Sequence, residues 1–184
     1  MQALSAELRP HFQSPCEAVR RISVDIGLEP GSRVLQVRYR IEGDIGRLAL
    51  PSTDFARRSD GLWQHTCFEA FLRPDASESY HEFNFAPCGD WAAYRFSTRR
   101  SDRSLPDLPA PLVRFRSGQD ACDLSADIPI PALPELAAAA VIHAGMAAVV
   151  ETDEGGLSWW ALSHGTEKPD FHDPATFVLR VTAR

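Results

Sequence analysis

The sequence lacks a long apolar run, an excess of basic residues and any recognisable export signal. No segment approaches the ~18 consecutive apolar residues that indicate a membrane-spanning helix. The first residues, MQALSAELRPHF, show neither the basic start nor the apolar run of a signal peptide. The 19 Lys and Arg are outnumbered by 25 Asp and Glu, whereas nucleic-acid and anionic-membrane binders usually carry a basic excess. We therefore expect a soluble, cytoplasmic protein without a nucleic-acid or membrane partner.

The cysteines also exclude some classes of protein. Cys16, Cys67, Cys88 and Cys122 are scattered, with no C-x-x-C pair among them. Such spacing disfavours a zinc knuckle, and a reducing compartment disfavours disulfide bonds. We interpret the four residues as small buried side chains. They indicate no metal site, and we expect no cofactor.

The pattern of residues predicts an all-β fold. The 184 residues, 44% of them hydrophobic, are typical of one globular domain, which we expect to span 1–184. Most of the 14 prolines fall between short runs of alternating apolar and polar residues, as in VLQVRYRI at 34–41. PALPELAAAAV permits only a turn or two of helix because it contains a proline. We expect a long surface loop at 98–111 and a jelly-roll-like antiparallel β-sandwich of about ten strands. The expected strands cover 19–27, 34–41, 64–72, 80–86, 90–98, 111–117, 121–129, 140–151, 157–163 and 175–182.

Three successive strands, at 64–72, 80–86 and 90–98, separate polar from apolar side chains. Side chains alternate between the two faces of a strand, and the short Pro/Gly-containing loops predict that these three strands are neighbours in the sheet. One face is predicted to be core and carries Phe68, Ala70, Leu72, Phe83, Phe85, Ala92, Tyr94 and Phe96. The other face is predicted to carry Trp63, Glu69, Glu82, Asn84, Trp91 and Arg95.

The polar face has two interpretations. Aromatic rings offer flat platforms for the C–H faces of a sugar, and Glu, Asn and Arg side chains can hydrogen-bond its hydroxyls. Alternatively, the charges decorate a solvent-exposed sheet, where cross-strand pairs contribute only about 0.2–1 kcal/mol each. An exposed Trp is uncommon on a monomer unless something covers it, which favours the first interpretation. The arginines at 95–103 leave open a preference for an anionic ligand.

A second group of ionisable residues lies in LSWWALSHGTEKPDFHDP, at 157–174. Their spacing matches no compact metal motif, although His164, Asp170 and His172 are possible ligands. The alternative is a loop whose Asp and His side chains satisfy its own backbone donors. On a regular strand one of two adjacent tryptophans faces the core and the other is exposed. The candidate ligand-binding residues from this segment are Trp159, Trp160, His164, Lys168, Asp170 and His172.

One segment resembles the DOMON-like sandwiches related to family 9 carbohydrate-binding modules, namely HTCFEAFLRPDASESYHEFNFAPCGDWAAYRF. The shared features are a strand with an acidic residue, a hairpin, a Tyr-x-x-Phe strand and a Pro-x-Gly turn. The resemblance implies a jelly-roll-like sandwich in which two Trp side chains clamp a sugar and a Glu binds its hydroxyls. Trp63 and Glu69 stand in comparable order, with Trp159 or Trp160 as the second clamp. The haem-binding relatives use Met and His ligands, but Met146 lies between Gly145 and Ala147, which indicates close packing.

We therefore predict a non-catalytic binding module for a carbohydrate or a sugar-like small molecule. The first alternative is a protein-interaction or self-association module that uses the Trp-rich surface. Two further alternatives are a glycoside-active enzyme that uses Glu69 and Glu82 as a carboxylate pair, and a haem-binding domain. The sequence leaves the oligomeric state open.

Overall fold

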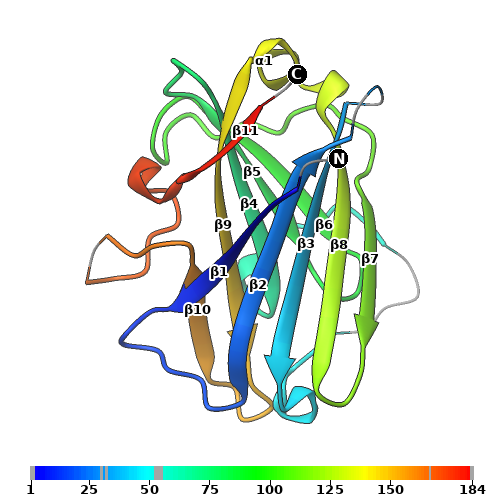
Figure 1. Cartoon of the computed structure of the whole chain (residues 1–184), viewed down its shortest axis with the longest axis vertical. Coiled ribbons are helices and arrows are strands. Elements are labelled where there is room, and N and C mark those ends of the chain that lie inside the picture. The colour runs from blue at the N-terminus through cyan, green and yellow to red at the C-terminus, as the bar shows by residue number, and fades with distance from the viewer. Residues whose placement is uncertain (1–2, 30, 32, 52–55, 166, 183–184) are drawn as a thin grey trace.

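A computed structural model describes every residue except 1–2, 30, 32, 52–55, 166 and 183–184 (Figure 1). The described residues form eleven strands, one five-residue helix, α1 (Pro134–Ala138), and four short 3₁₀ turns. No helix among them is long and apolar enough to cross a membrane. The strands are β1 (Leu4–Pro10), β2 (Val19–Leu28), β3 (Val34–Gly43), β4 (Cys67–Pro74), β5 (Tyr80–Phe85), β6 (Trp91–Phe96), β7 (Leu112–Ser117), β8 (Ala121–Pro129), β9 (Val141–Glu151), β10 (Leu157–Ala161) and β11 (Leu179–Thr182).

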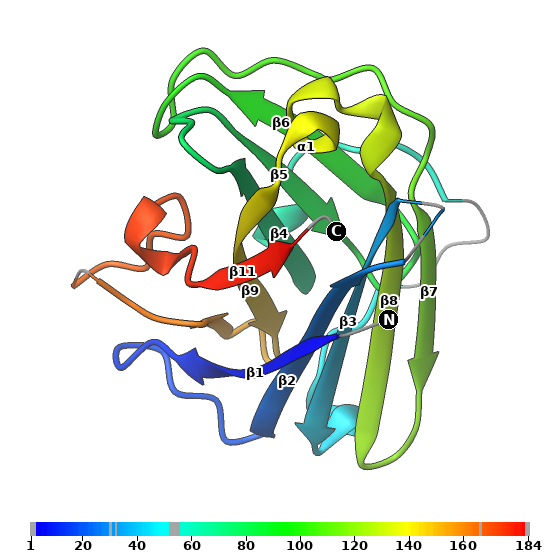
Figure 2. The ribbon, with the colours of Figure 1, turned by 45° about the horizontal axis from the view of Figure 1, so that its top comes forward.

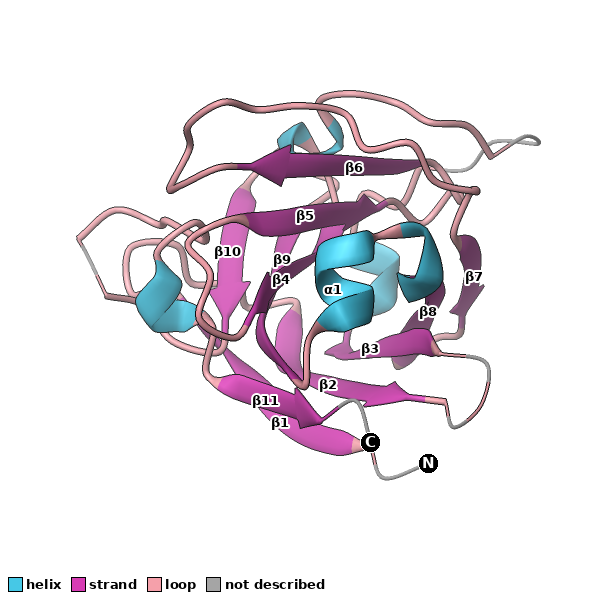
Figure 3. Cartoon of the chain, turned by 90° about the horizontal axis from the view of Figure 1, so that it is seen from above, coloured by secondary structure: helices cyan, strands magenta, loops and turns pink. Residues whose placement is uncertain are grey.

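All the strands belong to one antiparallel sheet that folds over on itself. Its order is β6-β5-β4-β9-β10-β1-β2-β3-β8-β7, and β11 also pairs with β9. β1 joins the two halves, because it pairs with β10 through Arg9 and Ala161 and with β2 through Leu4 and Ile26. We call β4, β5, β6, β9, β10 and β11 the β4 half, and β2, β3, β7 and β8 the β3 half. Figures 2 and 3 show the two halves facing each other.

The main core fills the space between the two halves. In β3 the alternation seen in the sequence buries Leu35, Val37 and Ile41 completely or almost so. Apolar side chains from β4, β5 and β9 of the β4 half, including Phe68, belong to the same core. Tyr39 crosses the core, and its hydroxyl donates a 2.7 Å hydrogen bond to the backbone oxygen of Glu69. Antiparallel pairing and strand number therefore confirm the predicted all-β class.

A second apolar cluster covers the outer face of the β4 half. The segment between β10 and β11 crosses that face and packs Phe177 against Phe71 at a ring separation of 5.7 Å. Tyr80 stacks on Phe96 at 5.1 Å beside them. As a result, β5 is buried along its whole length on both faces. The outer face is thus a second core with a pocket in it, where the sequence predicted a shallow sheet surface.

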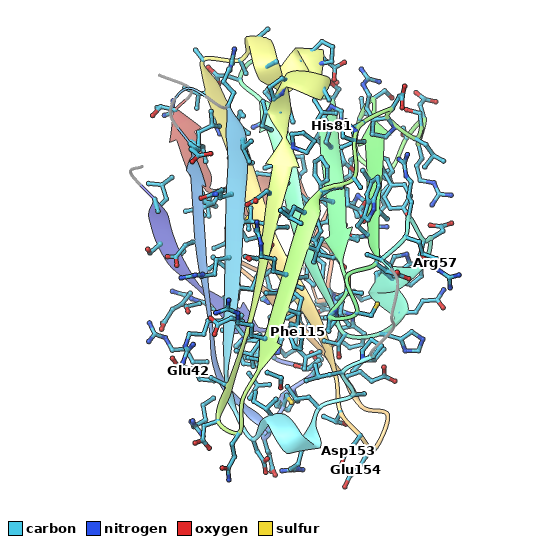
Figure 4. All side chains as sticks on the ribbon, turned by 90° about the vertical axis from the view of Figure 1, so that its right-hand side faces the viewer. Glu42, Arg57, His81, Phe115, Asp153 and Glu154 are labelled. Atoms are coloured by element: carbon cyan, nitrogen blue, oxygen red, sulfur yellow. The ribbon has the colours of Figure 1, made fainter. Side chains whose placement is uncertain are left out.

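The connections largely follow the sequence predictions. Residues 98–111 contain no named strand or helix and run beside β6, with isolated pairing between Arg95 and Ser104. α1 is the short helix expected from the Ala-rich stretch, and Figure 4 shows His81 at the same end of the molecule. β1 was not predicted, and the predicted strand at 175–182 is partly the 3₁₀ turn Pro174–Thr176.

Candidate functional site

A pocket of about 480 Å³ lies on the outer face of the β4 half. Aromatic and ionisable side chains supply most of its lining. The aromatic side chains are Trp63, Tyr94, Phe96, Trp159 and Phe171. The ionisable side chains are Glu69, Glu82, Arg100, Arg103 and His172.

Strand register brings the two glutamates into this pocket. In the β4–β5 pair Glu69 lies opposite Asn84, and Phe71 lies opposite Glu82. Residues opposite each other share a face, so Glu69 and Glu82 are diagonal neighbours on the pocket side. They are only 3% and 5% exposed, respectively. Two carboxyl groups are therefore buried beneath one pocket.

The two carboxyl groups differ in their partners. The Asn84 amide donates a 2.9 Å hydrogen bond to Oε1 of Glu82. In the described part of the chain no donor lies within hydrogen-bond distance of the Glu69 carboxyl group. An ionised carboxylate without donors is costly to bury, whereas a protonated one is much less so.

Burial raises the pKa of both groups. The pKa of Glu69 rises well above its usual range because the group is desolvated, and the charge of Glu82 adds to the effect. Desolvation also raises the pKa of Glu82 to about 7, against the opposing effects of the Asn84 hydrogen bond and of Arg100 and Arg103. Burial thus favours the protonated form of Glu69, and at neutral pH Glu82 is close to its titration point.

His172 closes one side of the pocket and is fixed by Tyr80. The backbone N–H of Arg100 donates to the Tyr80 hydroxyl at 3.2 Å, and this hydroxyl lies 2.7 Å from Nδ1 of His172. If Tyr80 donates to Nδ1, the proton of a neutral imidazole is on Nε2, which lies 3.5 Å from Oε2 of Glu82. Burial lowers the pKa of His172 to about 4, so the imidazole is neutral at pH 7.

The two pocket arginines already have carboxylate partners. Arg100 binds Asp170 at 2.9 Å. Arg103 lies 3.7 Å from Asp60 and packs over the ring of Tyr94, with its guanidinium carbon 5.1 Å from the ring centre. The basic groups at the pocket edge are therefore neutralised by acidic groups outside the lining.

The structure brings together part of the predicted site. Trp63, half exposed on the 3₁₀ turn Leu62–Gln64, and Trp159 line the pocket with Glu69, Glu82 and His172. Asn84 lies beneath and reaches the site through Glu82. Asp170 lies at the edge, where it binds Arg99 and Arg100. Lys168 is exposed on the same loop.

Other predicted residues lie elsewhere. Trp160 is buried in the main core, and Met146 lies there too, away from the pocket. His164 faces His11 on another part of the surface, and its Nε2–H donates a hydrogen bond to the backbone oxygen of Arg9, 2.8 Å away. Among the described residues no three His, Cys, Asp or Glu side chains gather as a metal site, so His164, Asp170 and His172 do not form one.

The predicted faces of β6 were wrong. Trp91 lies opposite Phe85 and Arg95 opposite His81, which places both on the main-core side of the sheet. Arg95 binds Glu135 of α1 at 3.0 Å, and His81 reaches the same carboxylate at 3.1 Å. Tyr94 and Phe96, which the sequence assigned to the core between the halves, line the pocket instead. Both faces of β6 are apolar, so apolarity could not identify the core side.

A larger hollow of about 730 Å³ lies on the outer face of the β3 half. It is a ladder of charged side chains, in which Arg40 binds Asp123 and Arg114 binds Asp127 at 2.8 and 3.1 Å. None of the described residues that line it is aromatic. Exposed pairs of this kind contribute little and need no ligand, so the pocket of the β4 half is the better candidate.

The fold and the pocket together define an all-β protein with a site of small-molecule size. No protein-family model matches the sequence, and no curated protein matches it significantly. A crystal structure from Bacteroides uniformis, described as a "putative carbohydrate-binding protein", has a similar fold, with a TM-score of 0.66 and 15% sequence identity. The similarity covers 98% of this chain and 85% of that one.

Proposed function

We propose that the protein is a non-catalytic binding module for a carbohydrate or a sugar-like small molecule, held in the pocket of the β4 half. The observation that carries the proposal is that Trp63 and Trp159 line the same pocket as the buried carboxyl groups of Glu69 and Glu82. Indole rings pack on the C–H faces of a sugar ring. A protonated carboxyl group both donates and accepts, as a sugar hydroxyl requires.

The similar crystal structure supports this choice of ligand through its description as carbohydrate-binding. The finer assignment that we propose is a single jelly-roll-like domain of the DOMON-like type. In this proposal Trp63 and Trp159 act as the two clamps, and Trp160, buried in the main core, supports the strand that carries Trp159. Asn84 acts indirectly, since it holds Glu82.

A protein-interaction or self-association role is the second candidate, because Trp63 is 50% exposed at the pocket edge. Light scattering separates the two proposals, since a sugar site is compatible with a monomer and self-association is not. A glycoside-active enzyme would use the same two glutamates, so product analysis accompanies each binding experiment.

The proposal is tested by titrating Trp fluorescence with neutral, acidic, amino and phosphorylated sugars. We expect saturable quenching by at least one sugar, lost in Trp63→Ala and in Glu69→Ala. Phe12→Ala is the matched control, because Phe12 is 71% exposed and does not line the pocket. Absence of binding by every sugar, with a folded protein, would contradict the proposal.

A further inference from the structure

The charges of the pocket are not balanced internally. Arg100 and Arg103 are paired with Asp170 and Asp60 outside the lining. Among the described residues no basic side chain forms an ion pair with Glu69, and the contact of this kind at Glu82 is with the buried His172 at 3.5 Å, while Arg100 and Arg103 act on the two acids from farther away. In the described part of the lining, the two acids are therefore the charged groups without a direct ion pair to a charged partner.

Glu69 is the clearest case. It is 3% exposed, its carboxyl group faces the pocket, and it has no hydrogen-bond donor among the described residues. Buried polar groups in proteins are almost always hydrogen-bonded, and the Glu69 carboxyl group keeps some access to the pocket, so a partner for it can come from the pocket. A ligand group that donates hydrogen bonds and carries positive charge would satisfy this carboxyl group best.

The surrounding aromatic rings suit the same ligand charge. Trp63, Phe96 and Trp159 line the pocket with the two acids, and the face of an aromatic ring attracts a cation. Arg103 already shows this attraction, since its guanidinium lies over Tyr94. An ammonium group between these rings and the acids would gain from both kinds of contact.

We propose that the ligand of this pocket is an amino sugar in its ammonium form, with the charged nitrogen placed against Glu69 and Glu82. This inference rests on the proposed carbohydrate-binding function and narrows it. An acidic sugar fits less well, because it would meet the two acids and compete with Asp170 and Asp60 for the arginines. Binding is expected to release a proton to solvent, since a carboxyl group that is protonated in the empty pocket ionises beside the ammonium group.

The test compares three pairs of hexoses, glucose, galactose and mannose, each with its 2-amino-2-deoxy analogue, by isothermal titration calorimetry at pH 7. We expect the amino form of the preferred pair to bind at least about tenfold more tightly than the neutral sugar. Titrations in two buffers with different ionisation enthalpies should show proton release for the amino sugar alone. Glu69→Gln should abolish the preference, so that the amino sugar and the neutral sugar bind this variant with affinities within about threefold of each other.

The matched control is Glu154→Gln, which removes one negative charge from an exposed turn at the opposite end of the molecule from His81 (Figure 4). Other charged groups also act on the two acids, namely Arg100, Arg103 and Asp60, and His172 lies 3.5 Å from Glu82. Proton release is therefore compared between wild type and Glu69→Gln. Tighter binding of neutral or acidic sugars would overturn the amino-sugar inference and leave the binding function intact. Absence of binding by all six sugars and by glucuronate would overturn both.

Discussion

The Tyr80 hydroxyl lies 2.7 Å from Nδ1 of His172 and so ties the central sheet to the loop that covers it. The same oxygen accepts the backbone N–H of Arg100, which lies in a different loop. One phenol group therefore fixes two of the segments that enclose the pocket.

Tyr80→Phe should destabilise the protein by about 1–2 kcal/mol, because it removes both hydrogen bonds and leaves an imidazole nitrogen without its partner. Tyr94→Phe is the matched control, and it should cost less than about 1 kcal/mol because its partner, Asp60, is 67% exposed. Urea unfolding measures both changes. Equal effects of the two substitutions would show that the Tyr80 contacts are not specially stabilising.

Glu82 should make stability depend on pH. Burial raises the pKa of Glu82 to about 7 in the folded state, whereas an unfolded glutamate titrates near pH ~4.3. Only the folded state holds the proton between these values, so the contribution of Glu82 is fully present below pH ~4.3 and is lost as the pH rises. Glu82→Gln cannot ionise. As the pH rises over this range, the free energy of unfolding of Glu82→Gln should therefore increase relative to that of wild type by up to about 1.4 kcal/mol per pH unit.

Urea titrations of the two proteins from pH 4 to 8 give this difference. His172, with its pKa lowered to about 4, acts in the opposite direction in both proteins and largely cancels in the comparison. Glu154→Gln, at an exposed position, controls for the loss of one charge. A difference that stays constant over the whole range would contradict the assigned burial of Glu82.

Gly145→Ala should disturb the apolar cluster beside the pocket. A β-carbon at Gly145 would lie 2.5 Å from Cδ1 of Phe177, whose ring stacks on Phe71. We expect a loss of about 1–3 kcal/mol in thermal or urea unfolding. Gly46→Ala is the control, because its β-carbon would meet only an Asp44 oxygen at 3.5 Å and should change stability little. Phe177→Leu in the Gly145→Ala background should recover part of the loss, and failure to do so would locate the clash elsewhere.

Substitutions of Trp63 and Trp160 should have different effects, the first on sugar binding and the second on stability. Trp63 is half exposed, so Trp63→Ala should change the free energy of unfolding by no more than about 0.5 kcal/mol while removing sugar binding. Trp160 is buried in the main core, and Trp160→Ala should cost about 3–5 kcal/mol. Urea unfolding and fluorescence titration are measured on both. A large loss of stability in Trp63→Ala would argue that Trp63 is a structural side chain.

Arg95→Ala should leave ligand affinity unchanged within about twofold, because Arg95 binds Glu135 on the other side of the sheet from the pocket. Sugar titration of Arg95→Ala beside Glu69→Ala measures the contrast. A loss of affinity in Arg95→Ala comparable with that in Glu69→Ala would show that Arg95 contributes to ligand binding.

The sequence predicted the faces of β4 and β5 correctly and that of β6 incorrectly, and the difference has a physical cause. In β5 the pocket-facing Glu82 and Asn84 are polar, so polarity marks the side away from the main core. In β6 the pocket-facing Tyr94 and Phe96 are apolar, because the second cluster covers this face. Pairing register, with Glu82 opposite Tyr94, would have corrected the assignment once the β5 face was known.

The cover of the pocket could not be predicted from local patterns. Phe177 fits over Gly145 of β9, a contact between residues that have no periodic relationship in the sequence. β1 was not predicted for a similar reason. Leu8 is its one buried residue, and the charged Glu7 and Arg9 on either side of it are typical of a surface loop. Its strand character comes from pairing with β2 and β10.

The position of β1 also has a consequence for biosynthesis. Arg9 leaves the ribosome long before its partner Ala161 is synthesised, because the two paired residues are far apart in the sequence. The two halves of the sheet therefore cannot be joined until β10 has been synthesised, and the edge of β1 that pairs with β10 stays open until then. Folding that depends on such distant pairing is slow and exposes strand edges to aggregation. We expect a fragment that ends before β10 to aggregate, although it contains the complete β3 half.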